Sequence, residues 1–322
     1  MKHWVSNKDQ NVVEETDFFV NDTKLPPALF AQLACGPSQP LPLKLEVKSL
    51  SKPFKFFRTY ENVKHYAGLS SDIYQCSNLG FDFNSLVNPA DLEKENKCSA
   101  DQIARVVQVV NDMHSESVSW NYTFILLIAA IRLVNNARTL STPHSESDLP
   151  TNVRSHRLRL DVGTKLAGSL AHGVTDFIVC IEHFRLVCLN ANKYGFTAKH
   201  KKGSYQLLAQ MVASRERVIR YYAACFPMWS LSELEELFGR YPTFGVSSTA
   251  GMDWHFVRYS KVAGKGYAKR SVDNVVSISQ QMAKLDGVIE SQTKPILEML
   301  CGMLSMQIQH ATEIEDIIVS RK

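Results

Sequence analysis

"VSWNYTFILLIAAIRLVNNA", residues 118–137, is apolar on nearly every side when it is wound into a helix. Such a helix belongs in the middle of a core, because none of its sides is suited to contact with water. Its most apolar run, Phe124–Ile131, lies between Asn121 and Arg132 and is far shorter than the roughly 20 residues that span a bilayer. We therefore predict a buried helix here, within a first helical layer at residues 61–138.

Apolar residues continue with helical spacing on both sides of this segment. Upstream, we expect a helix after Asn88 and Pro89, and Ser99 and Gln102 have the spacing of a capping box. Four apolar residues then fall on one face of that helix: Ile103, Val106, Val107 and Val110. Downstream, the same periodicity predicts helices over about residues 164–192, 204–226, 230–238, 272–290 and 295–319. The predicted fold is mainly α, an irregular multi-helix domain with at most a few short strands.

Three local signals mark the expected ends of the later helices. Ser230 and Glu233 again have the spacing of a capping box, and Gly239 stands where a left-handed C-terminal cap is expected. Pro295 suits the first turn of the last helix. That helix carries a long apolar stripe, which can pack on its own domain or on a partner subunit.

Residues 1–60 have the composition of an extended arm. Six prolines interrupt any long helix there: Pro26, Pro27, Pro37, Pro40, Pro42 and Pro53. Within the arm, "LPLKLEVKSL" (residues 41–50) alternates apolar residues with polar residues or proline, which predicts a short edge strand. Such an arm can pack back on its own domain or add to the surface of a neighbouring copy.

The segment "TLSTPHSESDLPTN", residues 139–152, is rich in serine and proline and predicts an exposed loop or linker. It is the best candidate for a domain boundary, although a long loop inside one domain would have the same composition. Residues 153–322 then form a basic C-terminal helical region that ends in a candidate assembly helix.

The bulk composition is that of a folded protein in a reducing compartment. Of the 322 residues, 45% are apolar and 21% are charged, which is ordinary for a globular chain. The seven cysteines are an odd set without regular spacing, and the first residues have no apolar core of a signal peptide. The net charge of +4 is too small to indicate a polyanionic partner by itself.

No sequence motif for catalysis or metal binding meets its spacing requirements. The "AGKG" at residues 263–266 lacks the first glycine of a phosphate loop, and Gly266 rather than Ser or Thr follows Lys265. Cys180, His183 and Cys188 lack a paired second half-site, so we interpret "FIVCIEHFRLVCL" as a core helix. We therefore expect no enzymatic activity, no catalytic residue, no cofactor and no metal, and an enzyme with a dispersed site is only the third hypothesis.

Basic residues, in contrast, gather in the C-terminal half of the chain. The segment "GMDWHFVRYSKVAGKGYAKRS", residues 251–271, interleaves aromatic and basic side chains, and no acid occurs between Asp253 and Asp273. We interpret it as a basic, aromatic loop before a helix. Basic side chains bind backbone phosphates and aromatic rings stack on unpaired bases. The candidate nucleic-acid-binding residues are Lys199, Lys201, Lys202, Arg215, Arg217, Arg220, Trp254, Arg258, Tyr259, Lys261, Lys265, Lys269 and Arg270.

An opposing interpretation keeps these aromatic residues as core anchors, with flanking charges that only solvate the surface. Charge clustering alone does not decide between the two interpretations.

Between about Ser99 and Ser279 the chain resembles the small helical coat proteins of RNA viruses, and most of all partitivirus-like plant virus capsid proteins. The resemblance rests on three segments: "WNYTFILLIAAIRLVNN" (120–136), "CFPMWSLSELEELFGRYPTFGV" (225–246) and "SSTAGMDWHFVRYSKV" (247–262). It implies a structural capsid or nucleocapsid protein, found in the virion and the host cytoplasm, with copies of itself and RNA as partners and no membrane. The alternative is a helical adaptor that binds a protein through its last helix and does not bind nucleic acid.

Overall fold

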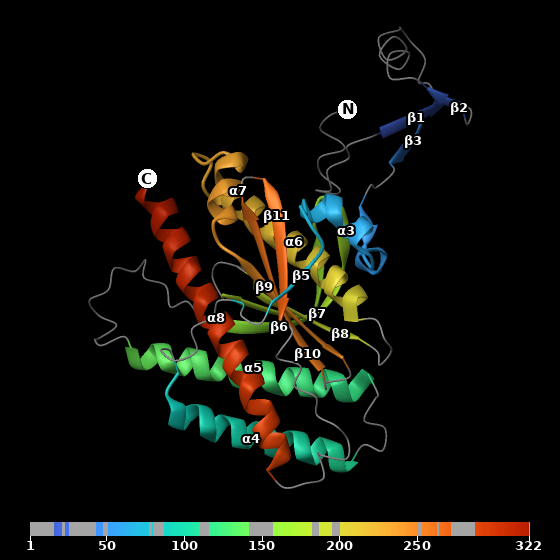
Figure 1. Cartoon of the computed structure of the whole chain (residues 1–322). Coiled ribbons are helices and arrows are strands. Elements are labelled where there is room, and N and C mark those ends of the chain that lie inside the picture. The colour runs from blue at the N-terminus through green and yellow to red at the C-terminus, as the bar shows by residue number, and fades with distance from the viewer. Residues whose placement is uncertain are drawn as a thin grey trace. The chain divides into compact units, whose positions relative to one another are not determined.

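The structure, a computed structural model of the whole chain, is shown in Figure 1. It describes residues 16–20, 23–25, 43–47, 51–76, 79, 87–109, 116–141, 157–181, 187–194, 200–249, 253–262, 264–271 and 287–321. Contacts divide the chain into two units, Met1–Lys52 and Pro53–Lys322. Residues on both sides of segment 139–152 belong to the second unit, so that segment does not separate two compact units.

The first unit contains a three-stranded antiparallel sheet of β1 (Thr16–Val20), β2 (Thr23–Leu25) and β3 (Leu43–Val47), in the order β2-β1-β3. Strand β3 lies at the edge of this sheet and falls within the segment whose alternation predicted an edge strand, so that prediction is confirmed. Most of the rest of the predicted arm lies outside the described residues. Phe54 and Phe57 are buried in the core of the second unit, so the prediction that the arm extends to residue 60 is wrong.

The second unit is built on a mixed eight-stranded sheet in the order β4-β7-β8-β9-β10-β11-β5, with β6 paired to β7. Strands β8 and β9 are parallel, and the chain passes from one to the other through two helices. Parallel neighbours need a long crossover connection of this kind. The strands are β4 (Lys52–Pro53), β5 (Tyr74–Cys76), β6 (Leu158–Ala167), β7 (Ala171–Ile181), β8 (Val187–Tyr194), β9 (Thr243–Thr249), β10 (Asp253–Val262) and β11 (Lys265–Ser271).

Helices cover both faces of this sheet (Figure 1). The α-helices are α3 (Tyr60–Ala67), α4 (Pro89–Val109), α5 (Glu116–Ser141), α6 (His200–Cys225), α7 (Leu231–Gly239) and α8 (Val288–Ser320), and η1 (Phe54–Phe56) is a short 3₁₀ turn. Phe244 and Phe256 share one buried cluster with α5 and α8, whereas Val257 and Tyr259 share another with α3 and α6. Alternate residues of the same strand therefore face different layers of helices.

Helix α6 lies very close to the sheet at Gly245 on β9. A Cβ atom at that position would lie 2.8 Å from the sulfur of Met211 and 3.0 Å from Cδ1 of Leu207. Any larger residue would push α6 away from the sheet, so the missing side chain sets the spacing between the two layers.

The prediction that the chain is rich in helix is confirmed, but the prediction of at most a few short strands is wrong. The largest error is at residues 164–192, where a helix was expected and β6, β7 and β8 are found. Residues Phe177–Ile181 are all buried, since β7 is covered on both faces. A strand buried on both faces is continuously apolar, and periodicity alone does not distinguish it from a buried helix.

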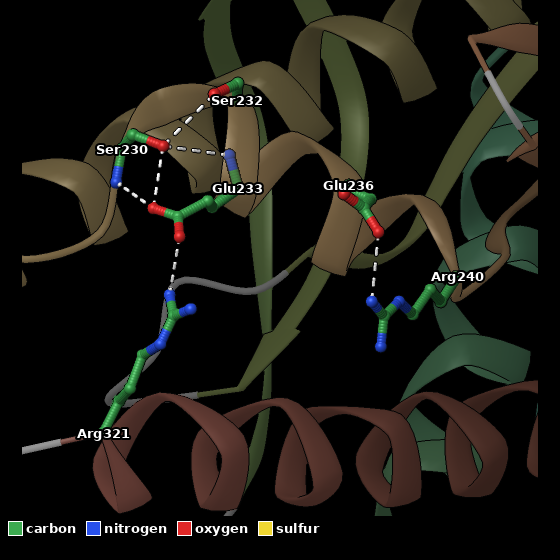
Figure 2. Close-up of polar contacts among 6 residues, drawn as sticks. All are labelled: Ser230, Ser232, Glu233, Glu236, Arg240 and Arg321. Atoms are coloured by element: carbon green, nitrogen blue, oxygen red, sulfur yellow. Dashed lines mark hydrogen bonds and ion pairs between the residues drawn. The ribbon is translucent and has the colours of Figure 1, made fainter.

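Several expected helix ends are confirmed and others are wrong. Ser230 caps α7 in a complete capping box with Glu233 (Figure 2). Ser99, in contrast, lies inside α4, which begins at Pro89. Gly239 ends α7 without a left-handed conformation, and Pro295 lies within α8 rather than in its first turn. The expected helix at residues 272–290 lies mostly outside the described residues.

The apolar stripe of α8 packs inside its own unit. Ile296, Leu300, Leu304 and Ile318 are fully buried in the cluster that also contains α5 residues. Thr293 on α8 donates a hydrogen bond to Oδ1 of Asn96 on α4 over 2.7 Å, within a buried site. Of the two expected roles for this helix, packing on its own domain is confirmed. The role of an assembly helix required an exposed apolar stripe, and these residues of the stripe are buried.

Candidate nucleic-acid interface

Residues 253–271 form a β-hairpin, so the interpretation of this segment as a loop before a helix is wrong. Strand β10 pairs with β11 in antiparallel register, with Arg258 opposite Lys269 and Ser260 opposite Tyr267. Gly264 lies in the turn with φ of 77°, a conformation that glycine adopts at little cost.

Gly266 brings the start of β11 against the end of α3. Its N–H donates to the carbonyl oxygen of Gly68 over 2.7 Å, and its own carbonyl accepts a bond from the N–H of Ser70 over 3.1 Å. Gly68 ends α3 in the left-handed conformation. The glycines of "AGKG" therefore serve a turn and a close backbone contact.

One face of the hairpin carries basic and aromatic side chains. Lys265, Tyr267 and Lys269 alternate along β11, so they point to the same side of the sheet. Both lysines are exposed, and 43% of the surface of Tyr267 is exposed. Arg258 on β10 is directly opposite Lys269 and therefore belongs to the same face.

Tyr74 on β5 extends this face to the edge of the sheet. Strand β5 pairs in parallel with β11 and places Tyr74 in register with Lys269. Tyr74 is 66% exposed, the most of any large hydrophobic residue described. We call Arg258, Lys265, Tyr267, Lys269 and Tyr74 the β11 face.

Arg258 is the most constrained member of the β11 face. It is half-buried, and its guanidinium donates a hydrogen bond to the carbonyl oxygen of Leu79 over 2.8 Å. This bond fixes its direction and leaves other guanidinium hydrogens for an anion. Two lysines and one oriented arginine thus stand beside two exposed rings, without an acid in either strand after Asp253.

Two predicted aromatic contacts are core residues instead. Trp254 has no exposed surface, and Tyr259 is 2% exposed with its hydroxyl donating to the carbonyl oxygen of Ala67 over 2.7 Å. Neither ring can stack on a base in this structure, so their assignment to the interface is wrong. The interpretation of aromatic residues as core anchors is confirmed for both.

The predicted cations on α6 belong to a different place. Helix α6 packs on the side of the hairpin that carries Val257 and Tyr259, opposite the β11 face. Arg215 is only 8% exposed, which removes it from any open surface. Arg217 is exposed, whereas Arg220 is half-buried and lies 4.0 Å from the carboxylate of Glu216.

The remaining predicted residues divide into two groups. Lys261 is half-buried and points to the same side as Tyr259, so it does not join the β11 face. Lys199 lies outside the described residues, and the side chains of Lys201, Lys202 and Arg270 are not described. The structure therefore brings together Arg258, Lys265 and Lys269 from the predicted set.

The candidate residues named from the sequence do not include Tyr267 or Tyr74, the two exposed rings of the β11 face. The alternation of Lys265, Tyr267 and Lys269 is a strand pattern that could have identified Tyr267 as a neighbour of the lysines. No local signal identifies Tyr74, because it joins β11 only through pairing between segments far apart in the sequence.

No group of three or more metal-binding side chains occurs among the residues that the structure describes. Cys180 lies on β7 rather than on a helix, and burial raises the pKa of its thiol to about 11. None of the described helices is both long and apolar enough to cross a membrane. We compared the chain with protein-family models, curated proteins and solved structures, and none of them matches it.

Proposed function

We propose that the chain binds RNA on the β11 face through contacts that do not depend on base sequence. The observation that carries this proposal is the alternation of exposed Lys265, Tyr267 and Lys269 beside exposed Tyr74. Lysines neutralise backbone phosphates, and tyrosine rings stack on any unpaired base. An exposed sheet surface with both groups suits a single-stranded segment of RNA.

The role that we propose for this binding is packaging in a viral coat, as the resemblance of the sequence to partitivirus-like capsid proteins implies. A coat protein also needs contacts between copies, and the unit Met1–Lys52 supplies a candidate. Its sheet ends in β2 and β3, which have no further partner among the described strands. Unpaired strand edges can add to a strand of another chain.

The alternative of a helical adaptor has less support. It depended on the apolar stripe of the last helix as a docking surface for another protein. Ile296, Leu300 and Leu304 on that stripe are buried within the same unit, so the surface is already covered.

The test is binding of a labelled single-stranded RNA, measured by fluorescence anisotropy over a range of salt concentrations. We expect the double variant Lys265→Glu/Lys269→Glu to bind more weakly. A plot of log K against log salt has a negative slope, and each lost phosphate contact makes it shallower by about 0.7. The loss of two contacts should therefore make it shallower by about 1.4.

Lys94→Glu/Lys97→Glu is the matched control. It makes the same change of charge at two exposed positions on α4. An equal loss of binding in both double variants would mean that RNA binding depends only on the net charge of the protein. That result would overturn the assignment to the β11 face.

The coat role is tested separately by size-exclusion chromatography with light scattering, with and without nuclease. We expect an assembly of many copies that contains nucleic acid. A monomer that shows no absorbance from nucleic acid, and whose mass does not change on nuclease treatment, would contradict the coat role.

A further inference from the structure

Helices α6, α7 and α8 and the start of β9 surround a cavity of about 30 Å³. Its lining combines apolar side chains such as Ile314 with the polar side chains of Arg215, Thr243 and His310. A cavity needs about 10–15 Å³ of such volume to hold one water molecule. This one therefore has room for a ligand of only a few atoms.

Arg215 places a positive charge in this cavity. The side chain is 8% exposed, and neither Nη1 nor Nη2 has a hydrogen-bond partner. The guanidinium lies over the ring of Tyr259, whose centre is 6.0 Å from Cζ of Arg215. Burial lowers the pKa of the guanidinium, and Tyr259 and, less strongly, Glu235 act in the opposite direction without forming a hydrogen bond to Nη1 or Nη2.

His310 supplies a second polar group to the same cavity. Its Nδ1 atom is buried and has no hydrogen-bond partner, while its ring packs against Tyr241 with 5.0 Å between centres. Burial lowers the pKa of this imidazole, the charge of Glu313 acts in the opposite direction, and the charge of Arg258 makes a smaller contribution that lowers it. A neutral imidazole can donate one hydrogen bond from a ring nitrogen.

A buried cation without a partner is costly, and an anion that accepts its hydrogen bonds offsets this cost. The two Nη atoms of one guanidinium match the two oxygens of a carboxylate, which accepts two parallel hydrogen bonds. Chloride is a single acceptor and lacks the paired oxygens that match the two Nη atoms.

We propose that this cavity binds a small free carboxylate, of the size of formate, between Arg215 and His310. The guanidinium holds both oxygens, and the imidazole N–H donates to one of them. The site is separate from the β11 face and does not depend on RNA binding.

The test uses the full chain at neutral pH and constant ionic strength, with sodium formate replacing sodium chloride. We expect a saturable rise of a few degrees in Tm, because a ligand that binds only the folded state stabilises it. Sodium pivalate, a carboxylate with a bulky tert-butyl group, should produce no such rise. No rise with formate, or an equal rise with pivalate, would overturn the proposal.

Arg215→Met removes the charge and keeps a long side chain, so it should abolish the rise. Arg217→Met is the matched control, since Arg217 is exposed on the same helix and should leave the rise unchanged. A formate response that survives in Arg215→Met would also overturn the assignment.

A direct measurement covers the case in which Arg215→Met does not fold. Binding of ¹³C-formate to the unmodified protein should broaden the formate NMR signal, and excess unlabelled formate should reverse the broadening. The variant His310→Phe keeps a ring beside Tyr241 but has no N–H, so it should reduce the broadening. Absence of broadening in the unmodified protein, or unchanged broadening in His310→Phe, would refute the site as described.

Discussion

Gly266 lies in direct backbone contact with Gly68, which accepts a 2.7 Å hydrogen bond from its N–H. A Cβ atom at position 266 would collide with the carbonyl oxygen of Ala67, the residue that ends α3. We expect Gly266→Ala to reduce the free energy of unfolding by about 1–3 kcal/mol, as overpacked sites do. Urea unfolding followed by circular dichroism measures this change.

Gly264→Ala separates the collision from the effect of any added methyl group. A Cβ atom there meets nothing within 4 Å, but φ is 77°. Its cost should be about 1 kcal/mol, from the left-handed conformation alone. Equal costs at both positions, or a cost at Gly264 above that at Gly266, would contradict the close contact with α3.

The sequence predicts the helices of this fold better than its sheet. Residues Val118–Ala137 were correctly predicted to be helical, as α5 shows, because an apolar run of this length is too long for a buried strand. Residues Phe177–Ile181 are equally apolar but short, and only their pairing with β6 and β8 makes them a strand. That pairing joins distant segments and leaves no local periodicity.

The same limit applies to the candidate interface. The sequence shows that Trp254 and Lys265 belong to one basic, aromatic segment, but not which side chains face water. Trp254 is buried because helices cover that part of β10, whereas Tyr267 on the neighbouring strand remains exposed. Alternation along a strand shows which side chains share a face, but which face is buried depends on the helix that lies above it, and no local pattern encodes that.

Tyr267 and Tyr74 predict a preference for unpaired bases. We expect Tyr267→Ala/Tyr74→Ala to weaken the binding of single-stranded RNA by about 1–3 kcal/mol for each base that loses its stacking partner. Binding of double-stranded RNA should change little, because its bases are not free to stack. Anisotropy with the two RNAs measures the difference.

Tyr60→Ala/Tyr221→Ala is the control for this prediction. Both rings lie outside the β11 face, Tyr60 at the start of α3 and Tyr221 on α6. If the control substitutions weakened the binding of single-stranded RNA as much as the substitutions of Tyr267 and Tyr74, stacking on the β11 face would be excluded.

Glu233 predicts a specific dependence of stability on pH. Its carboxylate accepts hydrogen bonds from the N–H and hydroxyl of Ser230 and lies 2.8 Å from Nη1 of Arg321 (Figure 2). These contacts, with the Ser230 N–H as the largest cause, lower the pKa of Glu233 from 4.5 to about 2. The stabilisation is therefore complete above pH 4.5 and is lost as the pH falls from 4.5 toward 2.

NMR titration of the Glu233 carboxyl carbon measures this pKa. In Arg321→Ala the pKa should rise but stay below 4.5, because the bonds from Ser230 remain. Arg240→Ala is the control, since Arg240 pairs with Glu236 instead, at 3.1 Å (Figure 2). A pKa near 4.5 in the unmodified protein would contradict the capping geometry.

The packing of α8 within its own unit and a docking role on a partner subunit predict different effects of truncating Leu300. This side chain is fully buried against the other helices of its unit, so Leu300→Ala should cost about 2–5 kcal/mol of unfolding free energy. Val319 on the same helix is 45% exposed, and Val319→Ala should change stability by about 0.5 kcal/mol or less. Urea unfolding at several protein concentrations distinguishes the two roles. If Leu300 served a partner subunit, its loss would reduce assembly and make stability depend on concentration. If it belongs to the core of its own unit, the loss of stability is the same at every concentration.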